Sequence, residues 1–105
     1  MTFTGDEAEE FPLVTAGEWT ANYRAANPNK IKAHFFGYKI IKKILAQEGC
    51  VGIRCYHALD DKGVQQLIMV GADCNQNDLI NGIIAEVARP CPPYCSTPNP
   101  LVGNP

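Results

Sequence analysis

The sequence lacks any long apolar run and has little charge of either sign. It contains no stretch of about 18 consecutive apolar residues, so no membrane-spanning helix is expected. The first ten residues contain neither Lys nor Arg and no apolar core, so no secretory signal is expected either. Charged residues make up 19% of the 105 residues and the net charge is −2, which gives no general attraction to nucleic acid or to an anionic membrane. We therefore expect a soluble, cytoplasmic protein without membrane or nucleic-acid partners.

A disulfide framework is not expected. The five cysteines are an odd number in a chain without a secretory signal, which leaves room for one disulfide, a metal site or a reactive thiol. The length allows one domain that buries about 65% of the surface that the unfolded chain would expose. No second domain is expected.

Two apolar runs, residues 51–59 and 64–72, organise the rest of the chain. They are joined by Asp60-Asp61-Lys62-Gly63. Asp favours the first positions of a type I turn, and Gly63 tolerates a left-handed conformation. The two runs are therefore predicted to form a β-hairpin.

The pairing of the hairpin follows from the length of its link. If Leu59 pairs with Val64, Cys55 faces Ile68, and the two strands gather one apolar face. A glycine bulge at the turn would shift this register by one residue. Residues 67–70 are apolar without alternation, so the second strand is predicted to be an interior strand.

A helix start is predicted before the hairpin. Thr15 is the expected N-cap, Glu18 completes a capping box, and Val14 packs against Trp19 as a hydrophobic staple. This first helix should end near Ala26, because Pro28 disfavours helical conformation in the residue before it.

Two further helices are predicted from apolar residues at helical spacing, over about 36–48 and about 78–88. Residues 30–35 are left open between helix and strand. Six of the eight prolines lie in residues 90–105, which predicts an extended tail.

The predicted fold class is therefore α+β, with two N-terminal helices, a central β-hairpin, a third helix and a Pro-rich C-terminal tail. Residues 1–10 are expected to form a flexible acidic arm because they hold little that can be buried. Residues 11–89 form the single domain, and residues 90–105 form the extended tail.

The segment Cys91-Pro92-Pro93-Tyr94-Cys95 is the most unusual local sequence. Its two thiols could bridge each other or supply two metal ligands, but their spacing is not the Cys-x-x-Cys of redox and zinc motifs. A structural turn that fastens the tail is the alternative. The candidate metal ligands are Cys91 and Cys95 with His34 or His57, and further ligands could come from Cys50, Cys55 or Cys74.

Cys55 and His57 form a second candidate site. Two positions apart on a strand, they point to the same face, as in a thiolate–imidazole pair. Ile53 and Leu59 share that face, which favours a small core residue at Cys55 and a strand-end residue at His57. No local motif supplies a third member, so no catalytic residue is assigned.

Two weaker patterns are interpreted as structural. Asp73, Asn75 and Asn77 match the start of a calcium loop, but Asp78 and Ile84 stand where the loop needs glycine and glutamate, so a capped polar loop is favoured. A basic cluster is interpreted as a solvated face. It consists of Lys30, Lys32, Lys39, Lys42 and Lys43.

Five segments resemble a family of small, uncharacterised bacterial proteins of about this length. They are EWTANYR at 18–24, HFFG at 34–37, GIRCY at 52–56, VGAD at 70–73 and CPPYC at 91–95. The resemblance covers most of residues 12–95. It implies a single-domain bacterial protein of unknown function, and it carries over no catalytic or ligand residue.

The expected function is that of a non-enzymatic binding or protein-interaction module without a cofactor. The alternative is a small thiol- or metal-dependent enzyme that uses Cys91 and Cys95, or Cys55 and His57. A homodimer is also expected, because an isolated two-stranded hairpin is marginal and a second copy would supply a matching edge. The hairpin or the apolar helical faces would form the contact.

Overall fold

The computed structural model describes residues 2–104, which contain two helices and two small antiparallel sheets. The chain divides into two compact units. The sheet unit comprises residues 2–8 and 36–88, and the disulfide unit comprises residues 9–35 and 89–104. The mixed α+β class is confirmed, and the number of helices is not. No helix in the described part of the chain is long and apolar enough to cross a membrane.

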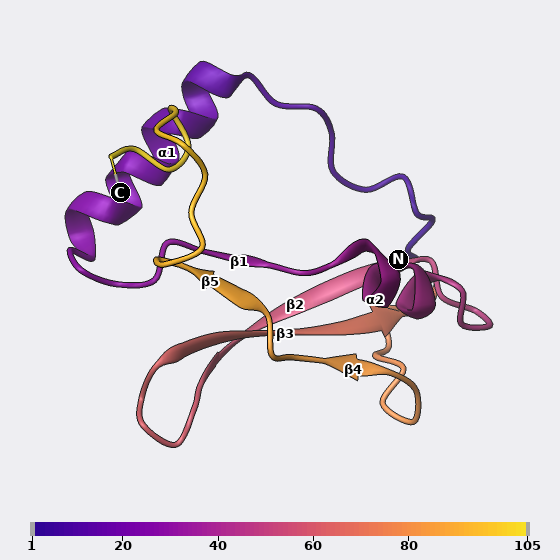
Figure 1. The fold of residues 1–105 in the computed structure, drawn as a ribbon. Helices are drawn as coiled ribbons and strands as arrows, with labels where there is room; N and C mark the ends of the chain where they lie inside the picture. Colours follow the sequence, from indigo (N-terminus) through magenta and orange to yellow (C-terminus); the bar gives the residue numbers. More distant parts are fainter. Residues whose placement is uncertain (1, 105) are drawn as a thin grey trace. The chain divides into compact units, whose positions relative to one another are not determined.

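The sheet unit is built on the hairpin and one helix (Figure 1). Helix α2 spans Tyr38–Leu45, strand β2 spans Gly52–Leu59, strand β3 spans Gln65–Ala72 and strand β4 spans Ile84–Ala85. The strand order is β2-β3-β4. The second strand of the hairpin is therefore the interior strand, as its apolar run predicts.

The register of the hairpin differs by one residue from the simplest expectation. Leu59 pairs with Gln65 instead of Val64. Gly63 adopts φ +78°, its N–H donates to the Asp60 carbonyl at 2.9 Å, and the Asp60 N–H donates to the Val64 carbonyl at 2.9 Å. This is a type I turn followed by a left-handed glycine, the bulge that shifts the register.

The core of the sheet unit lies between α2 and one face of the sheet. Ile44 is 0% exposed and packs with Met69 and Ala85. Because the register is shifted, Met69 lies opposite Cys55 in place of the expected Ile68. Partly buried apolar side chains surround this cluster: Phe36, Ile40, Ile41, Cys50, Ile53 and Ile83.

The prediction of a third helix over residues 78–88 is wrong. The Leu79 N–H donates to the Gly71 carbonyl at 2.9 Å, and the Ile83 N–H donates to Oε1 of Gln47 at 2.8 Å. These donors bond to the sheet and to a side chain, so they are not used within a helix. Gly82 and the β-branched residues that follow it favour this extended path.

The disulfide unit contains helix α1, Leu13–Ala26, and a second sheet. Strand β1 spans Ala33–Phe35 and pairs antiparallel with strand β5, Arg89–Cys91. Part of the segment 30–35, which the sequence leaves open, is therefore a strand.

The start of α1 also differs from the prediction. Pro12 is the N-cap with φ −62°, no side chain caps the helix, and the Pro12 carbonyl accepts the Ala16 N–H at 2.9 Å. Proline is suited to a helix start because its φ is already near the helical value. Thr15 therefore lies inside the helix. The residue that packs on Trp19 is Phe11 in place of the expected Val14, with 4.7 Å between the centroids of the Phe11 and Trp19 rings.

The extended tail is not confirmed. Residues 89–91 belong to β5, and the remaining segment runs beside α1 (Figure 1). Arg24 Nη1 donates to the Leu101 carbonyl at 2.7 Å, and Lys32 Nζ donates to the Val102 and Asn104 carbonyls at 3.1 Å each. Polar side chains of residues 20–32 thus fasten the tail.

Candidate functional site

Strand β2 forms one edge of the sheet in the sheet unit. It is eight residues long and pairs along its whole length with β3 on one side. Within the described residues, the sheet places no strand on its other side. Long edges of this kind offer backbone donors and acceptors for pairing with another chain.

Alternate residues of β2 direct their backbone groups outward. The bond from the Asp60 N–H to the Val64 carbonyl, 2.9 Å, continues the register of β2 with β3 and places the hydrogen-bonded pairs at the even-numbered residues. The odd-numbered residues therefore point their N–H and C=O groups away from β3. These residues are Ile53, Cys55, His57 and Leu59.

The edge lacks the usual devices that prevent pairing. Natural edge strands are often short or carry Lys or Pro, whereas β2 contains neither Lys nor Pro and has one charged residue, Arg54. Apolar side chains are also exposed beside it, with Leu59 at 69% and Tyr56 at 46%. The strand therefore has the properties of a contact surface.

A polar cluster lies on the face of the sheet opposite the core. Arg54 Nη1 forms an ion pair with Oδ1 of Asp78 at 2.5 Å, and the Tyr56 hydroxyl donates to Oδ2 of the same carboxylate. Arg54 Nη1 also donates to the Gln76 carbonyl at 3.1 Å, and its guanidinium lies 5.4 Å from the centre of the Phe3 ring. Arg54 and Tyr56 thus fasten the segment that follows β3.

The electrostatics of this cluster do not favour acid–base chemistry. Hydrogen bonds from Tyr56 and Arg54 hold the pKa of Asp78 below its usual value. The hydrogen bond to Asp78 raises the pKa of Tyr56, because the carboxylate holds the phenolic proton. At neutral pH the cluster is an ionised carboxylate between two donors, which is a structural clamp.

The loop after β3 is capped as the sequence predicts. Oδ1 of Asp73 accepts the N–H groups of Asn75 at 2.9 Å and Asn77 at 3.0 Å. This carboxylate oxygen closes the turn itself. In residues 2–104 no group of three or more His, Cys, Asp or Glu side chains is arranged to hold a metal ion.

Cys55 and His57 lie on the same face of β2, as expected from their spacing. Both are exposed, so the interpretation of Cys55 as a core residue is wrong. Helix α2 covers the part of this face near Ile53 and Met69, which leaves the part near the turn open. The pair is accessible, and the role of a catalytic pair stays untested.

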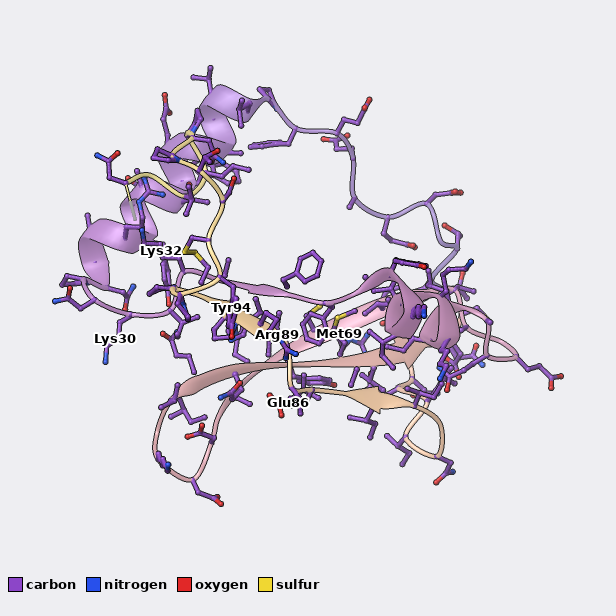
Figure 2. The ribbon with its side chains drawn as sticks, viewed as in Figure 1. Lys30, Lys32, Met69, Glu86, Arg89 and Tyr94 are labelled. Carbon is purple, nitrogen blue, oxygen red and sulfur yellow. A yellow bond between two sulfur atoms is a disulfide. The ribbon has the colours of Figure 1, made fainter. Side chains whose placement is uncertain are left out.

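Cys91 and Cys95 form a disulfide with a Cα–Cα distance of 4.8 Å. Cys91 is 5% exposed, and the guanidinium of Arg89 lies 6.0 Å from the centre of the Tyr94 ring within the same short segment (Figure 2). Bonded sulfurs are not thiolate ligands. The metal site predicted at Cys91 and Cys95 stays a prediction about the reduced pair, with His34 on β1 and His57 on β2 as its further candidates.

The lysines of the basic cluster differ in their use. Lys32 is bound to the tail carbonyls described above, whereas Lys30 is exposed. The three lysines of α2 project into solvent, as a solvated face requires: Lys39, Lys42 and Lys43.

A cleft of about 300 Å³ lies beside the end of α2. Its ionisable lining groups are the carboxylates of Glu48 and Asp78, and Asp78 is engaged by Arg54 and Tyr56. The remaining lining groups form no cluster of charge. The residues that line it are Gln47, Glu48, Asp78, Leu79, Ile80, Asn81 and Gly82.

No protein-family model matches the chain, and neither a curated protein nor a solved structure matches it. The resemblance to small bacterial proteins therefore stays a prediction.

Sequence reasoning missed the cluster of Arg54, Tyr56 and Asp78. Its signal was present in part, because Arg54 and Tyr56 alternate on one face of a predicted strand. The missing information was the path of residues 73–78, which brings Asp78 back beside Ala72 in an antiparallel bridge.

Proposed function

We propose that this protein is a non-enzymatic protein-interaction module that works as a homodimer. The observation that carries the proposal is the outer edge of β2, which is eight residues long, pairs with no strand in residues 2–104 and carries the exposed Leu59 and Tyr56. A chain with such an edge either pairs in its working state or risks indiscriminate aggregation. The small core around Ile44 supports the same proposal, because association would bury further apolar surface.

The test is the mass of the purified protein in solution, compared with that of two Leu→Lys variants. Light scattering coupled to size exclusion should give twice the chain mass of 11.5 kDa at tens of micromolar protein. Leu59→Lys should weaken association at least about tenfold, because a lysine beside the edge opposes pairing. Leu101→Lys is the matched control, since Leu101 is exposed in the disulfide unit. A mass of one chain for the unmodified protein contradicts the homodimer.

The alternative function is a small thiol- or metal-dependent enzyme. It is supported by the exposure of Cys55 and His57 on one strand face and by the Cys91–Cys95 pair. Thiol titration and metal analysis separate the two functions. A module should show free thiols of ordinary reactivity and no stoichiometric metal, whereas one hyper-reactive cysteine or bound zinc would favour the enzyme.

We also propose the cytoplasm as its location, because Cys50, Cys55 and Cys74 are free cysteines and reducing compartments keep thiols reduced. The Cys91–Cys95 disulfide bears on this proposal, because disulfides persist in oxidising compartments and are rare in the cytosol. Alkylation of the free thiols in intact cells, followed by mass spectrometry, would report the state of the pair. A reduced pair supports the cytoplasm, and an oxidised pair contradicts it.

A further inference from the structure

We propose that a second copy of this chain pairs antiparallel along the outer edge of β2, with Tyr56 opposite the partner subunit's Tyr56. The two sheets would then form one continuous sheet across the two-fold axis. This inference rests on the proposed homodimer and specifies its contact surface and register.

The register follows from the backbone groups that β2 leaves outward. Ile53 would bond with the partner subunit's Leu59, and Cys55 with the partner subunit's His57. All four outward residues of each strand are then used as donors and acceptors. A shift by two residues brings either Ile53 or Leu59 opposite residues beyond the strand, and a shift by one residue brings outward groups opposite inward ones. The Tyr56-centred register therefore forms the most hydrogen bonds.

The side chains are compatible with the same register. Arg54 would lie opposite the partner subunit's Ala58, so the only charged residue of β2 meets a small neutral one. The small side chain leaves the ion pair between Arg54 and Asp78 undisturbed. The two Tyr56 rings would face each other in a non-hydrogen-bonded pair, where the side chains of antiparallel strands are closest.

The strand is thus self-complementary, which is the requirement of a two-fold contact. Its outward groups match their own copy in number and spacing, and no like charges meet. A partner strand with other charges would gain nothing from β2, because Arg54 is already neutralised by Asp78. These features favour a second copy over a different peptide.

Cysteine cross-linking tests the register. Cys55 and Cys74 are exposed free thiols, so both are changed to Ser. In that background, Tyr56→Cys places one thiol opposite its own copy, whereas Ala58→Cys places its thiol opposite the partner subunit's Arg54. Mild copper-catalysed oxidation by oxygen removes two electrons and two protons from a facing thiol pair. Tyr56→Cys should form covalent dimer at least about tenfold faster than Ala58→Cys, because only its thiols are held together.

Light scattering before oxidation separates failure of the register from failure of the homodimer. A dimer that cross-links at position 56 supports both. A dimer that cross-links equally well at positions 56 and 58, or at neither, overturns the β2 register and keeps the homodimer. A monomer overturns both.

His57→Pro gives a second test if Tyr56→Cys does not fold. It removes one outward N–H and no bond to β3, and proline is tolerated where an edge N–H faces solvent. The variant should keep its circular dichroism spectrum and lose dimer affinity at least about tenfold. A folded variant that dimerises as tightly as the unmodified chain overturns the inference.

Discussion

The sheet unit and the disulfide unit are each stabilised by a different kind of interaction. In the sheet unit, Ile44 is buried against Met69 and Ala85, and a continuous ladder joins β2 to β3. In the disulfide unit the buried residues are small or linked, namely Gly17, Cys91 and Val102. One unit relies on apolar packing, and the other relies on a covalent link and on polar side chains that hold the tail.

Each unit is therefore sensitive to a different kind of change. Apolar packing is lost when a buried side chain is truncated, whereas a covalent link is lost under reducing conditions. The sheet unit should therefore respond to changes in its core and at its edge, and the disulfide unit should respond to reductant.

Truncation of the sheet-unit core has the largest expected effect. Ile44→Ala should lower the free energy of unfolding by about 2–5 kcal/mol, because a fully buried side chain leaves a cavity. Leu45→Ala is the neighbouring control and should cost less than about 1 kcal/mol, since Leu45 is exposed. Denaturant titration followed by circular dichroism measures both. Equal losses would show that α2 packs through a different face.

Loss of the disulfide should destabilise the disulfide unit and leave the sheet unit unchanged. The link closes a loop of five residues, so replacing Cys91 and Cys95 by Ala together should cost about 2 kcal/mol. Trp19 is the only tryptophan of the chain and lies in α1, so its fluorescence reports on the disulfide unit. Dithiothreitol should lower the midpoint of unfolding of the unmodified protein, and it should leave the midpoint of the double variant unchanged. A reductant effect on the double variant would contradict this origin.

Two turns of the sheet unit share one hydrogen-bond pattern and have different residues at their left-handed position. In each, an Asp accepts two backbone N–H groups and the fourth residue is left-handed. That residue is Gly63 with φ +78° in the turn from Asp60, and Gln76 with φ +70° in the turn from Asp73. A left-handed conformation is costly for any residue with a Cβ. The second turn therefore carries strain that the first lacks.

Substitutions at these two positions should change the stability of the protein in opposite directions. Gly63→Ala should destabilise the protein by about 1 kcal/mol, and Gln76→Gly should stabilise it by up to about 1 kcal/mol. The Gln76 carbonyl still accepts from Arg54 after the change, because the bond uses the backbone. Thermal unfolding of both variants checks the pair. Two changes of the same sign would contradict the strain at Gln76.

The smallest expected effect is a loss of sheet-unit stability in acid. The pKa of Asp78 is lowered by Tyr56 and Arg54, so its contribution is present above the unfolded pKa of about 3.9 and is lost as the pH falls through the folded value. Relative to the rate of an unprotected amide at the same pH, amide exchange of residues 73–78 should therefore rise below about pH 4. Asp78→Asn should remove that part of the pH dependence. An unchanged pH profile in the variant would assign the effect to other carboxylates.

The hairpin could be predicted from sequence because its signals are local. Two apolar runs and the Asp60–Gly63 link locate both strands, and the apolar stretch of β3 indicates its interior position. The register depends on whether Gly63 forms a bulge, and turn residues alone allow both outcomes. The prediction for the start of α1 failed for a similar reason. Pro12 and Thr15 are both suited to a helix start, and the helix begins after Pro12.

The third helix and the polar cluster could not be predicted because their causes are distant in the sequence. Residues 79–85 have helical spacing, yet Gln47 and Gly71 supply acceptors that hold them extended. The same path brings Asp78 to Arg54. The disulfide was one of several outcomes open to Cys91 and Cys95, since spacing alone does not decide between a bridge and a metal site.

A second copy is proposed to cover the outer edge of β2, and amide hydrogen exchange across β2 measures whether that edge is covered. The amides of Arg54, Tyr56 and Ala58 bond to β3 and should exchange slowly in both the monomer and the dimer. At tens of micromolar protein the account predicts equally slow exchange at the outward amides, which rises at least about tenfold on dilution to the monomer. The outward amides are those of Ile53, Cys55, His57 and Leu59. An alternating pattern, slow at even and fast at odd positions at every concentration, would contradict the account.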